Sequence, residues 1–223
     1  MNTEHPSAAC IIVAAGRGER LGARQAKALV PLEGRPLLAW ALDGVRAAGV
    51  TRVVVVGPPD DLAEVGRWAP GCTVVAGGAT RQQSVTAGLA ALADDPVDYL
   101  LVHDAARCLT PPKVITAVLA ALRQGHRVVI PAVPVVDTLR LRTGGVVDRS
   151  ALVAVQTPQG FTREVLLAAH SEADPDATDD ALLAERGGAR VQLVPGHEES
   201  VKITTALDLL TAAAIVRSRR GVG

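Results

Sequence analysis

The chain has 223 residues, of which 48% are hydrophobic and only 2% aromatic, and its 23 Lys and Arg residues balance 23 Asp and Glu residues. This length suits one α/β domain with an aliphatic core. Zero net charge and few aromatic side chains argue against a general nucleic-acid binder or a base-stacking platform. Three widely spaced cysteines, no long apolar run and no basic leader favour a reduced, soluble, cytoplasmic protein.

Runs of β-branched residues alternate with Ala- and Leu-rich segments along most of the chain. Near-continuous Val and Ile runs are typical of strands that are buried on both faces of a parallel sheet. Strands are predicted at 10–14, 52–56, 73–76, 99–103, 127–131, 151–155 and 190–194, and helices at 36–48, 81–93, 112–123, 162–170, 180–186 and 205–217. We therefore expect an α/β protein: a single domain over residues 1–223, with a mainly parallel, twisted, Rossmann-like sheet flanked by helices.

The segment at about 133–149 breaks this alternation. It contains Asp137-Thr138, an alternation of Leu and Arg over residues 139–142, and Gly144-Gly145, which is a hairpin turn signal. The segment predicts a protruding β-arm rather than another βα unit.

The loop after the first predicted strand carries the strongest local signal. Its small residues are Ala14, Ala15, Gly16 and Gly18. Such residues leave backbone N–H groups exposed in a tight turn, where they can cradle phosphate oxygens. The dinucleotide fingerprint fails because its third glycine falls at Leu21, and the P-loop fails because Lys27 is followed by Ala28. What distinguishes the loop is its cations, Arg20 and Lys27, which are placed to face a triphosphate.

Together with residues 31–38, this loop resembles the G-x-G-x-R…K signature of sugar-phosphate nucleotidyltransferases. Further blocks narrow the resemblance. They are His103-Asp104-Ala105-Ala106-Arg107, Asp137-Thr138, Gln156-Thr157-Pro158-Gln159-Gly160-Phe161, Thr178-Asp179-Asp180 and Val201-Lys202-Ile203-Thr204-Thr205. In this order and spacing they resemble the 2-C-methyl-D-erythritol 4-phosphate cytidylyltransferases of non-mevalonate isoprenoid biosynthesis, over about residues 10–216.

The resemblance implies a nucleotidyltransferase fold and a role for each matched residue. Arg20 and Lys27 would be catalytic and would stabilise the transition state. The residues around the nucleotide would be Ala14, Ala15, Gly16 and Gly18 at the phosphates, Gly78 and Ser84 at the cytosine, and Asp104, Ala105 and Arg107 beside the ribose and substrate. The residues around the methylerythritol phosphate would be Thr138, Arg149, Thr157, Thr178 and Lys202. In the family the arm crosses to a second subunit, which implies a homodimer in which Thr138 and Arg149 serve the neighbouring site.

The expected reaction needs charge stabilisation more than a general base. The second pKa of a phosphate monoester is about 6, so the attacking phosphate is already largely dianionic at neutral pH. Two anions must then meet, and a pyrophosphate must leave with extra charge. Arg20 and Lys27 would supply two positive charges. Mg²⁺ would supply two more while held mainly by the CTP phosphates, without a dedicated set of protein ligands.

The sequence departs from the family pattern in three places. Ala26 and Ala28 flank Lys27 where proline and glutamine are usual, Cys108 replaces a proline, and Ser200 stands where asparagine is common. The charged residues are kept, so these changes concern the rigidity of loops.

Other interpretations remain open from the residues themselves. The acceptor can be another polyol phosphate such as ribitol 5-phosphate, the nucleotide can be UTP or GTP, or the chain can bind CTP without catalysis. Structural roles also compete: His103 as a core histidine, Asp104 and Arg107 as an ion pair, and residues 178–180 as a helix N-cap.

Overall fold

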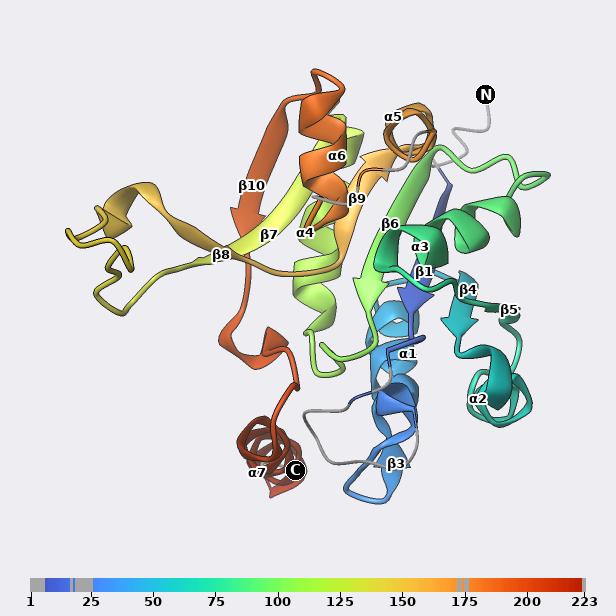
Figure 1. Cartoon of the computed structure of the whole chain (residues 1–223). Helices are drawn as coiled ribbons and strands as arrows, with labels where there is room; N and C mark the ends of the chain where they lie inside the picture. Colours follow the sequence, from blue (N-terminus) through green and yellow to red (C-terminus); the bar gives the residue numbers. More distant parts are fainter. Residues whose placement is uncertain (1–6, 17, 19–25, 172–173, 175–176, 222–223) are drawn as a thin grey trace.

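A computed structural model describes residues 7–16, 18, 26–171, 174 and 177–221, and the chain builds a twisted sheet with helices on both faces (Figure 1). The strands of the main sheet are β1 (Ala8–Val13), β4 (Arg52–Gly57), β5 (Thr73–Ala76), β6 (Tyr99–Asp104), β7 (Val128–Pro134), β8 (Val153–Val155), β9 (Gln159–Thr162) and β10 (Val191–Pro195). Their order is β10-β7-β9-β6-β1-β4-β5, with β8 paired to β7.

The helices are α1 (Leu37–Ala47), α2 (Leu62–Trp68), α3 (Arg81–Ala90), α4 (Pro112–Arg123), α5 (Arg163–Ala169), α6 (Asp180–Arg186) and α7 (Ala206–Gly221). Two short strands, β2 (Pro31–Leu32) and β3 (Arg35–Pro36), form a separate hairpin. The short 3₁₀ turns are η2 (Lys27–Leu29), η3 (Pro59–Asp61), η4 (Arg149–Ala151) and η5 (Glu198–Ser200). No helix in the described part of the chain has the length and apolar character needed to cross a membrane.

The sheet is mostly parallel, as predicted. β1 runs parallel to β4 and β6, β4 to β5, and β7 to β10. The exceptions are β8 and β9, which run antiparallel to their neighbours. The sequence did not predict β9, because its residues Gln159–Thr162 contain no Val or Ile and include Gly160. A Cβ on Gly160 would lie 2.4 Å from the Val118 side chain, so glycine here lets α4 pack closely on the strand.

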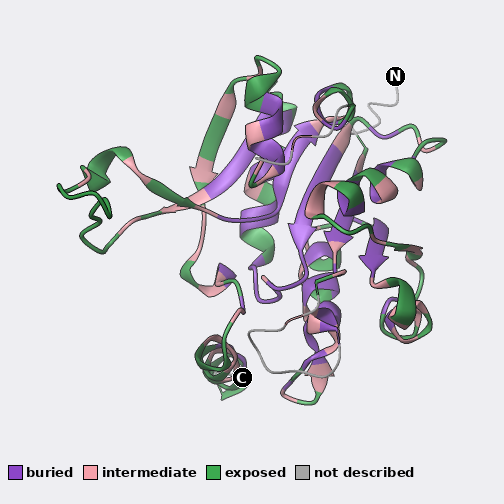
Figure 2. Cartoon of the chain, viewed as in Figure 1, coloured by how far each residue is buried: buried purple, intermediate pink, exposed green. Residues whose placement is uncertain are grey.

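Alternate residues of the central strands belong to two different hydrophobic clusters. Cys10 and Ile12 of β1 pack with α1, α2 and α4, whereas Ala9 and Ile11 pack with α3, α5 and α6. This is the period of two expected for a strand that is covered on both faces. Figure 2 shows the central strands buried along their length. A third cluster joins α7 to α1 and the small hairpin.

The chain leaves the sheet between β7 and β8 and forms the projection coloured yellow to gold in Figure 1. Residues 135–152 are held by few backbone hydrogen bonds of their own, among them Val147 N to Leu139 O at 2.9 Å and Leu141 N to Gly145 O at 3.2 Å. One isolated bridge pairs Arg140 with Val146. The projection is thus less regular than a two-stranded hairpin, and we call residues 135–152 the arm.

Candidate functional site

The carboxyl ends of β1, β4, β5 and β6 meet at one edge of the sheet, which is where open α/β sheets bind ligands. A cavity of about 240 Å³ lies there. Its lining comprises Val13, Ala14, Ala15, Gly16, Lys27, Ala28, Gly78, Ala79, Thr80, Arg81, Ser84, Asp104, Ala105, Ala106 and Lys202. A second hollow of about 710 Å³ shares part of this wall and adds Gly18, residues 58–60, Gly77 and Thr204.

The loop after β1 turns back on itself beside the cavity. Ala14 N donates to Val56 O at 2.8 Å, and Lys27 N donates to Gly16 O at 3.0 Å. Gly18 has a positive φ of 69°, and a Cβ there would lie 2.9 Å from the Lys27 Cβ. Glycine therefore allows the turn to bring Lys27 to the wall shared by both hollows. Arg20, the other predicted catalytic cation, lies outside the described residues.

The segment between β5 and α3 forms the opposite wall. A Cβ on Gly77 would lie 2.6 Å from the Ala15 Cβ, so the two loops approach too closely for a side chain at Gly77. Ser84 is 2% exposed; its Oγ donates to Thr80 O at 3.0 Å and accepts from Gly78 N at 3.2 Å. Thr80 also caps α3 in a capping box with Gln83. Ser84 thus fixes the shape of the glycine loop from beneath.

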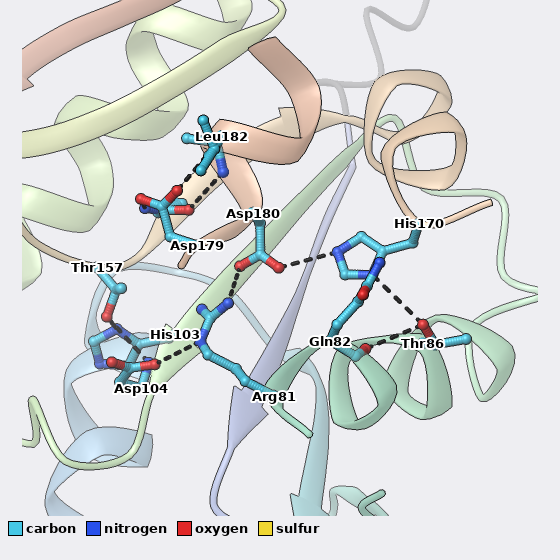
Figure 3. Close-up of polar contacts among 12 residues, drawn as sticks. Arg81, Gln82, Thr86, His103, Asp104, Thr157, His170, Asp179, Asp180 and Leu182 are labelled. Carbon is cyan, nitrogen blue, oxygen red and sulfur yellow. Dashed lines mark hydrogen bonds and ion pairs between the residues drawn. The ribbon is translucent and has the colours of Figure 1, made fainter. Parts of the chain in front are cut away.

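Asp104, at the end of β6, lies beside Arg81 (Figure 3) and is paired with two cations. Its Oδ2 lies 2.8 Å from Lys202 Nζ and its Oδ1 lies 3.5 Å from Arg81 Nε. Burial would raise the pKa of Asp104, but the cations of Arg81 and Lys202 outweigh it and lower that pKa to about 2. Lys202 is brought to this position because Ile203 N donates to Ala106 O at 2.9 Å.

His103 and Thr157 support Asp104 from inside the protein. Thr157 Oγ1 lies 2.9 Å from His103 Nδ1 and accepts from the Asp104 backbone N–H at 3.0 Å. Both side chains are buried, and burial lowers the pKa of His103 to about 4, so the ring is neutral at pH 7. The interpretation of His103 as a core histidine is confirmed. Thr157, predicted at the acceptor, has its hydroxyl engaged within this network.

The Arg107 guanidinium donates its hydrogen bonds to two backbone carbonyls. Its Nη1 donates to Ser200 O at 2.7 Å and its Nη2 to Val155 O at 3.0 Å. The interpretation of Asp104 and Arg107 as an ion pair is therefore wrong, because Arg81 and Lys202 occupy both carboxylate oxygens. Arg107 does not line the cavity among the described residues. Through these two hydrogen bonds, Arg107 connects the segment before Lys202 to β8.

The remaining acceptor residues are dispersed. Asp179 caps α6 by accepting from Leu182 N at 2.9 Å, which confirms the N-cap interpretation, and Thr178 is exposed beside it. Thr138 and Arg149 lie on the arm, both exposed, and the Arg149 guanidinium donates to Val136 O. Neither lines the cavity.

Arg81 is the charged residue of the described cavity lining that sequence reasoning missed. It is the first residue of α3, directly after the Thr80 cap. The available signal was the position of Arg81 shortly after Gly77-Gly78 and directly after the helix cap Thr80. A cationic side chain at the start of a helix is usually exposed to solvent, so this signal was not used.

Nothing in the described ranges gathers three or more His, Cys, Asp or Glu side chains into a metal-binding group. The described carboxylates that line the two hollows are Asp104 and Asp60. Asp104 is already engaged by two cations. A divalent cation here would therefore depend on ligands that arrive with it.

The comparisons with known proteins agree along nearly the whole chain. A family model described as 2-C-methyl-D-erythritol 4-phosphate cytidylyltransferase matches residues 8–218. The protein of that name from Rhodococcus opacus is 51% identical over 213 residues, covering 92% of this chain and 93% of the relative. The one from Nocardia farcinica is 49% identical over 222 residues, covering 96% and 95%. The crystal structure of the one from Thermus thermophilus has a TM-score of 0.79 at 35% identity, covering 95% and 98%.

Proposed function

Because the chain belongs to the 2-C-methyl-D-erythritol 4-phosphate cytidylyltransferase family, we propose that it transfers the cytidylyl group of CTP to 2-C-methyl-D-erythritol 4-phosphate. The products are 4-diphosphocytidyl-2-C-methyl-D-erythritol and pyrophosphate, in isoprenoid biosynthesis. The observation that carries the proposal is the cavity at the carboxyl edge of the sheet, which is lined by Lys27 and by the Lys202–Asp104 pair.

The nucleotide fits the part of the two hollows that is lined by residues 14–16, Gly18, residues 77–81 and Ser84. Short side chains and glycines there leave room for phosphates and base, and the close approach at Gly77 fixes the distance between the two loops. Ala14, Ala15, Gly16 and Gly18 would face the phosphates, and Gly78 the cytosine. Ser84 would act through the loop that it holds.

The chemistry forms one P–O bond and breaks another. A phosphate oxygen of the acceptor attacks the α-phosphorus of CTP, and the bond to the β-phosphate breaks with pyrophosphate as the leaving group. Lys27, together with Arg20, would stabilise the charge that develops on the phosphates. Lys202 would hold the acceptor phosphate, oriented by Asp104 at 2.8 Å.

Mg²⁺ fits this site as a cation carried in by the triphosphate. It usually keeps several waters and binds through one or two carboxylates plus substrate phosphates, which suits a wall with few carboxylates available. Bound there, it would neutralise phosphate charge. Asp104, held ionised, lines the cavity and has the right chemistry to contribute a ligand.

The arm supports a homodimer. Thr138 and Arg149 are predicted to bind the acceptor, yet they lie on a projection that does not line the cavity of its own chain. Val136, Leu141 and Val146 are 78%, 58% and 62% exposed on the same projection. Apolar side chains gathered on one exposed element are typical of an interaction surface. The cytoplasmic location expected from the sequence stays a prediction.

The first test follows pyrophosphate release from CTP, Mg²⁺ and 2-C-methyl-D-erythritol 4-phosphate, with ribitol 5-phosphate and UTP in parallel. We expect release with CTP and the methylerythritol phosphate alone. Relatives at about half identity carry that name, so the ribitol alternative is not favoured. Release with ribitol phosphate alone would overturn the acceptor, equal use of UTP would overturn the nucleotide, and CTP binding without release would leave a binding protein.

A second test addresses the dimer by mixing two inactive variants, Lys27→Ala and Arg149→Ala. If the arm completes the partner's site, a mixed dimer has one intact site, and activity returns to about a quarter of the wild-type value after subunit exchange. If Arg149 serves its own chain, each site of a mixed dimer carries one defect and no activity returns.

A further inference from the structure

Arg81 is held between two aspartates from different parts of the fold. Its Nη1 lies 2.7 Å from Asp180 Oδ2, and its Nε lies 3.5 Å from Asp104 Oδ1 (Figure 3). The Asp180 side chain is 1% exposed and that of Arg81 is 27% exposed. A buried carboxylate is costly unless it is paired, so Asp180 needs both of its partners.

The second partner of Asp180 is His170, at the end of α5. His170 Nε2 lies 3.0 Å from Asp180 Oδ1, and both side chains are 1% exposed. Burial would raise the pKa of Asp180, but His170 and Arg81 outweigh it and lower that pKa. The carboxylate therefore stays ionised and accepts a hydrogen bond from Nε2. On the other side of the ring, Nδ1 lies 3.5 Å from Thr86 Oγ1 on α3.

Basic and acidic side chains thus alternate along a line of contacts from the core to the cavity. It runs from His170 through Asp180, Arg81 and Asp104 to Lys202. It links α5, the start of α6, the start of α3, the end of β6 and the segment after η5. None of the roles that the family resemblance implies uses Arg81, Asp180 or His170.

Arg81 thereby joins the two halves of the site. The start of α3 follows the nucleotide segment that contains Gly78, and the start of α6 follows Thr178, a predicted acceptor contact. Gln159 also anchors α6, through Asp179 at 2.7 Å and Ala181 N at 3.1 Å. Those bonds fix α6 to β9. The Arg81–Asp180 ion pair fixes α6 to α3 across the site.

We infer that Arg81, clamped by Asp104 and by the buried Asp180–His170 pair, is a positioning residue that holds the acceptor side of the site in register with the nucleotide side. This inference rests on the proposed function. It assigns Arg81 no direct contact with the reacting atoms. Its effect acts through Thr178 and Lys202, so loss of the clamp disturbs acceptor use more than CTP binding.

The experiment compares Asp180→Asn, His170→Leu and His170→Gln with the wild type in steady-state pyrophosphate release and in calorimetric CTP binding. We expect Asp180→Asn and His170→Leu to lower kcat/KM for the acceptor by about tenfold or more, since small misplacements at a reacting centre have effects of this size. The CTP dissociation constant changes by less than about threefold, because the glycine loop is held by Ser84 and the capping box. His170→Gln keeps an N–H for Asp180 and restores most of the activity. Arg127→Gln, which breaks the exposed 3.3 Å pair with Glu164, is the matched control without effect.

Hydrogen exchange across residues 177–186 separates this inference from the proposed function. We expect Asp180→Asn to accelerate exchange there by about tenfold, and Arg127→Gln to leave it unchanged. If wild-type protein shows no turnover, the proposed function fails, and the exchange result alone decides the clamp. The inference is overturned if exchange is unchanged in Asp180→Asn, or if an active wild type and its variants use the acceptor equally well. Equal losses of acceptor use and of CTP affinity would also overturn it, since they indicate a general structural defect.

Discussion

The wall of the cavity and the arm are built in opposite ways. The wall lies at the ends of β1, β4 and β6, whose side chains are mostly buried, and of β5, whose side chains are partly exposed. Several of its polar groups are paired within the chain: Ser84 with Gly78, Thr157 with Asp104, and Asp104 with Lys202. The arm has one isolated bridge and exposes Val136, Leu141 and Val146. The described part of the wall is therefore held by contacts within a single chain, whereas the arm exposes apolar side chains.

The two proposed substrates would therefore be bound by regions that are built in different ways. The nucleotide half of the proposed site rests on the sheet, where packing fixes geometry to fractions of an ångström. Part of the proposed acceptor half, Thr138 and Arg149, lies on the arm, which is held by few backbone hydrogen bonds of its own. The family chemistry needs both halves in line, so the connection between them is the most sensitive part of the site.

Loss of Lys27 is expected to have the largest effect on the nucleotide half. Lys27→Ala removes a cation from the wall shared by both hollows, which we expect to lower kcat by about 100-fold or more, as for other electrostatic donors. Pyrophosphate release measures it. Lys113→Ala, on the exposed side of α4, is the matched control. A Lys27→Ala enzyme with near wild-type turnover would remove Lys27 from the mechanism.

The buried wall should also respond to pH through His103. Its pKa is about 4 in the folded chain and 6.5 ordinarily, so the unfolded state takes up the proton first as pH falls. The stability that this histidine contributes is present above pH 6.5 and is lost as pH falls towards 4, by roughly 3 kcal/mol in the free energy of unfolding. Urea unfolding of His103→Asn should lack this part of the slope, and the exposed His126→Asn should keep it. Identical slopes in all three proteins would contradict a neutral, buried His103.

The contact between the two nucleotide loops gives a smaller effect. Gly77→Ala places a Cβ 2.6 Å from the Ala15 Cβ, so one loop must shift, and we expect CTP affinity to fall by about tenfold. Calorimetric titration measures it. Gly66→Ala in α2 meets nothing within 4 Å and should bind CTP normally. Equal affinity in the two variants would show that this wall adapts.

The arm should give the smallest effect on stability and a clear effect on assembly. Leu141 is 58% exposed, so Leu141→Ser should change the free energy of unfolding of dilute protein by no more than about 0.5 kcal/mol. Sedimentation equilibrium should show weaker self-association than in the wild type. Leu207→Ser, at a residue of α7 that is 71% exposed, controls for the loss of an exposed leucine outside the arm. Unchanged association would place the subunit contact elsewhere.

The α/β class, most of the strands and helices, and the family could all be predicted from the amino-acid pattern. Parallel strands that are buried on both faces produce Val and Ile runs that can be seen without any partner, and β5, α4 and α6 have the predicted bounds. The loop of small residues and the cations around it are local patterns as well. β9 was missed because a strand of Gln, Gly, Phe and Thr is stabilised by its neighbours rather than by its own residues.

The pairing of the charges, in contrast, could be known only from the folded chain. Lys202 lies far along the chain from Asp104, and Asp180 far from Arg81, yet they meet at 2.8 Å and 2.7 Å because the sheet brings β6, α3 and α6 together. The fold likewise places Arg107 so that it donates to the carbonyls of Val155 and Ser200, which the sequence could not predict. Sequence patterns report which residue types are present and where the local elements lie. Pairing among buried charges depends on distances that only packing sets, since each unpaired partner would lose its hydration without compensation.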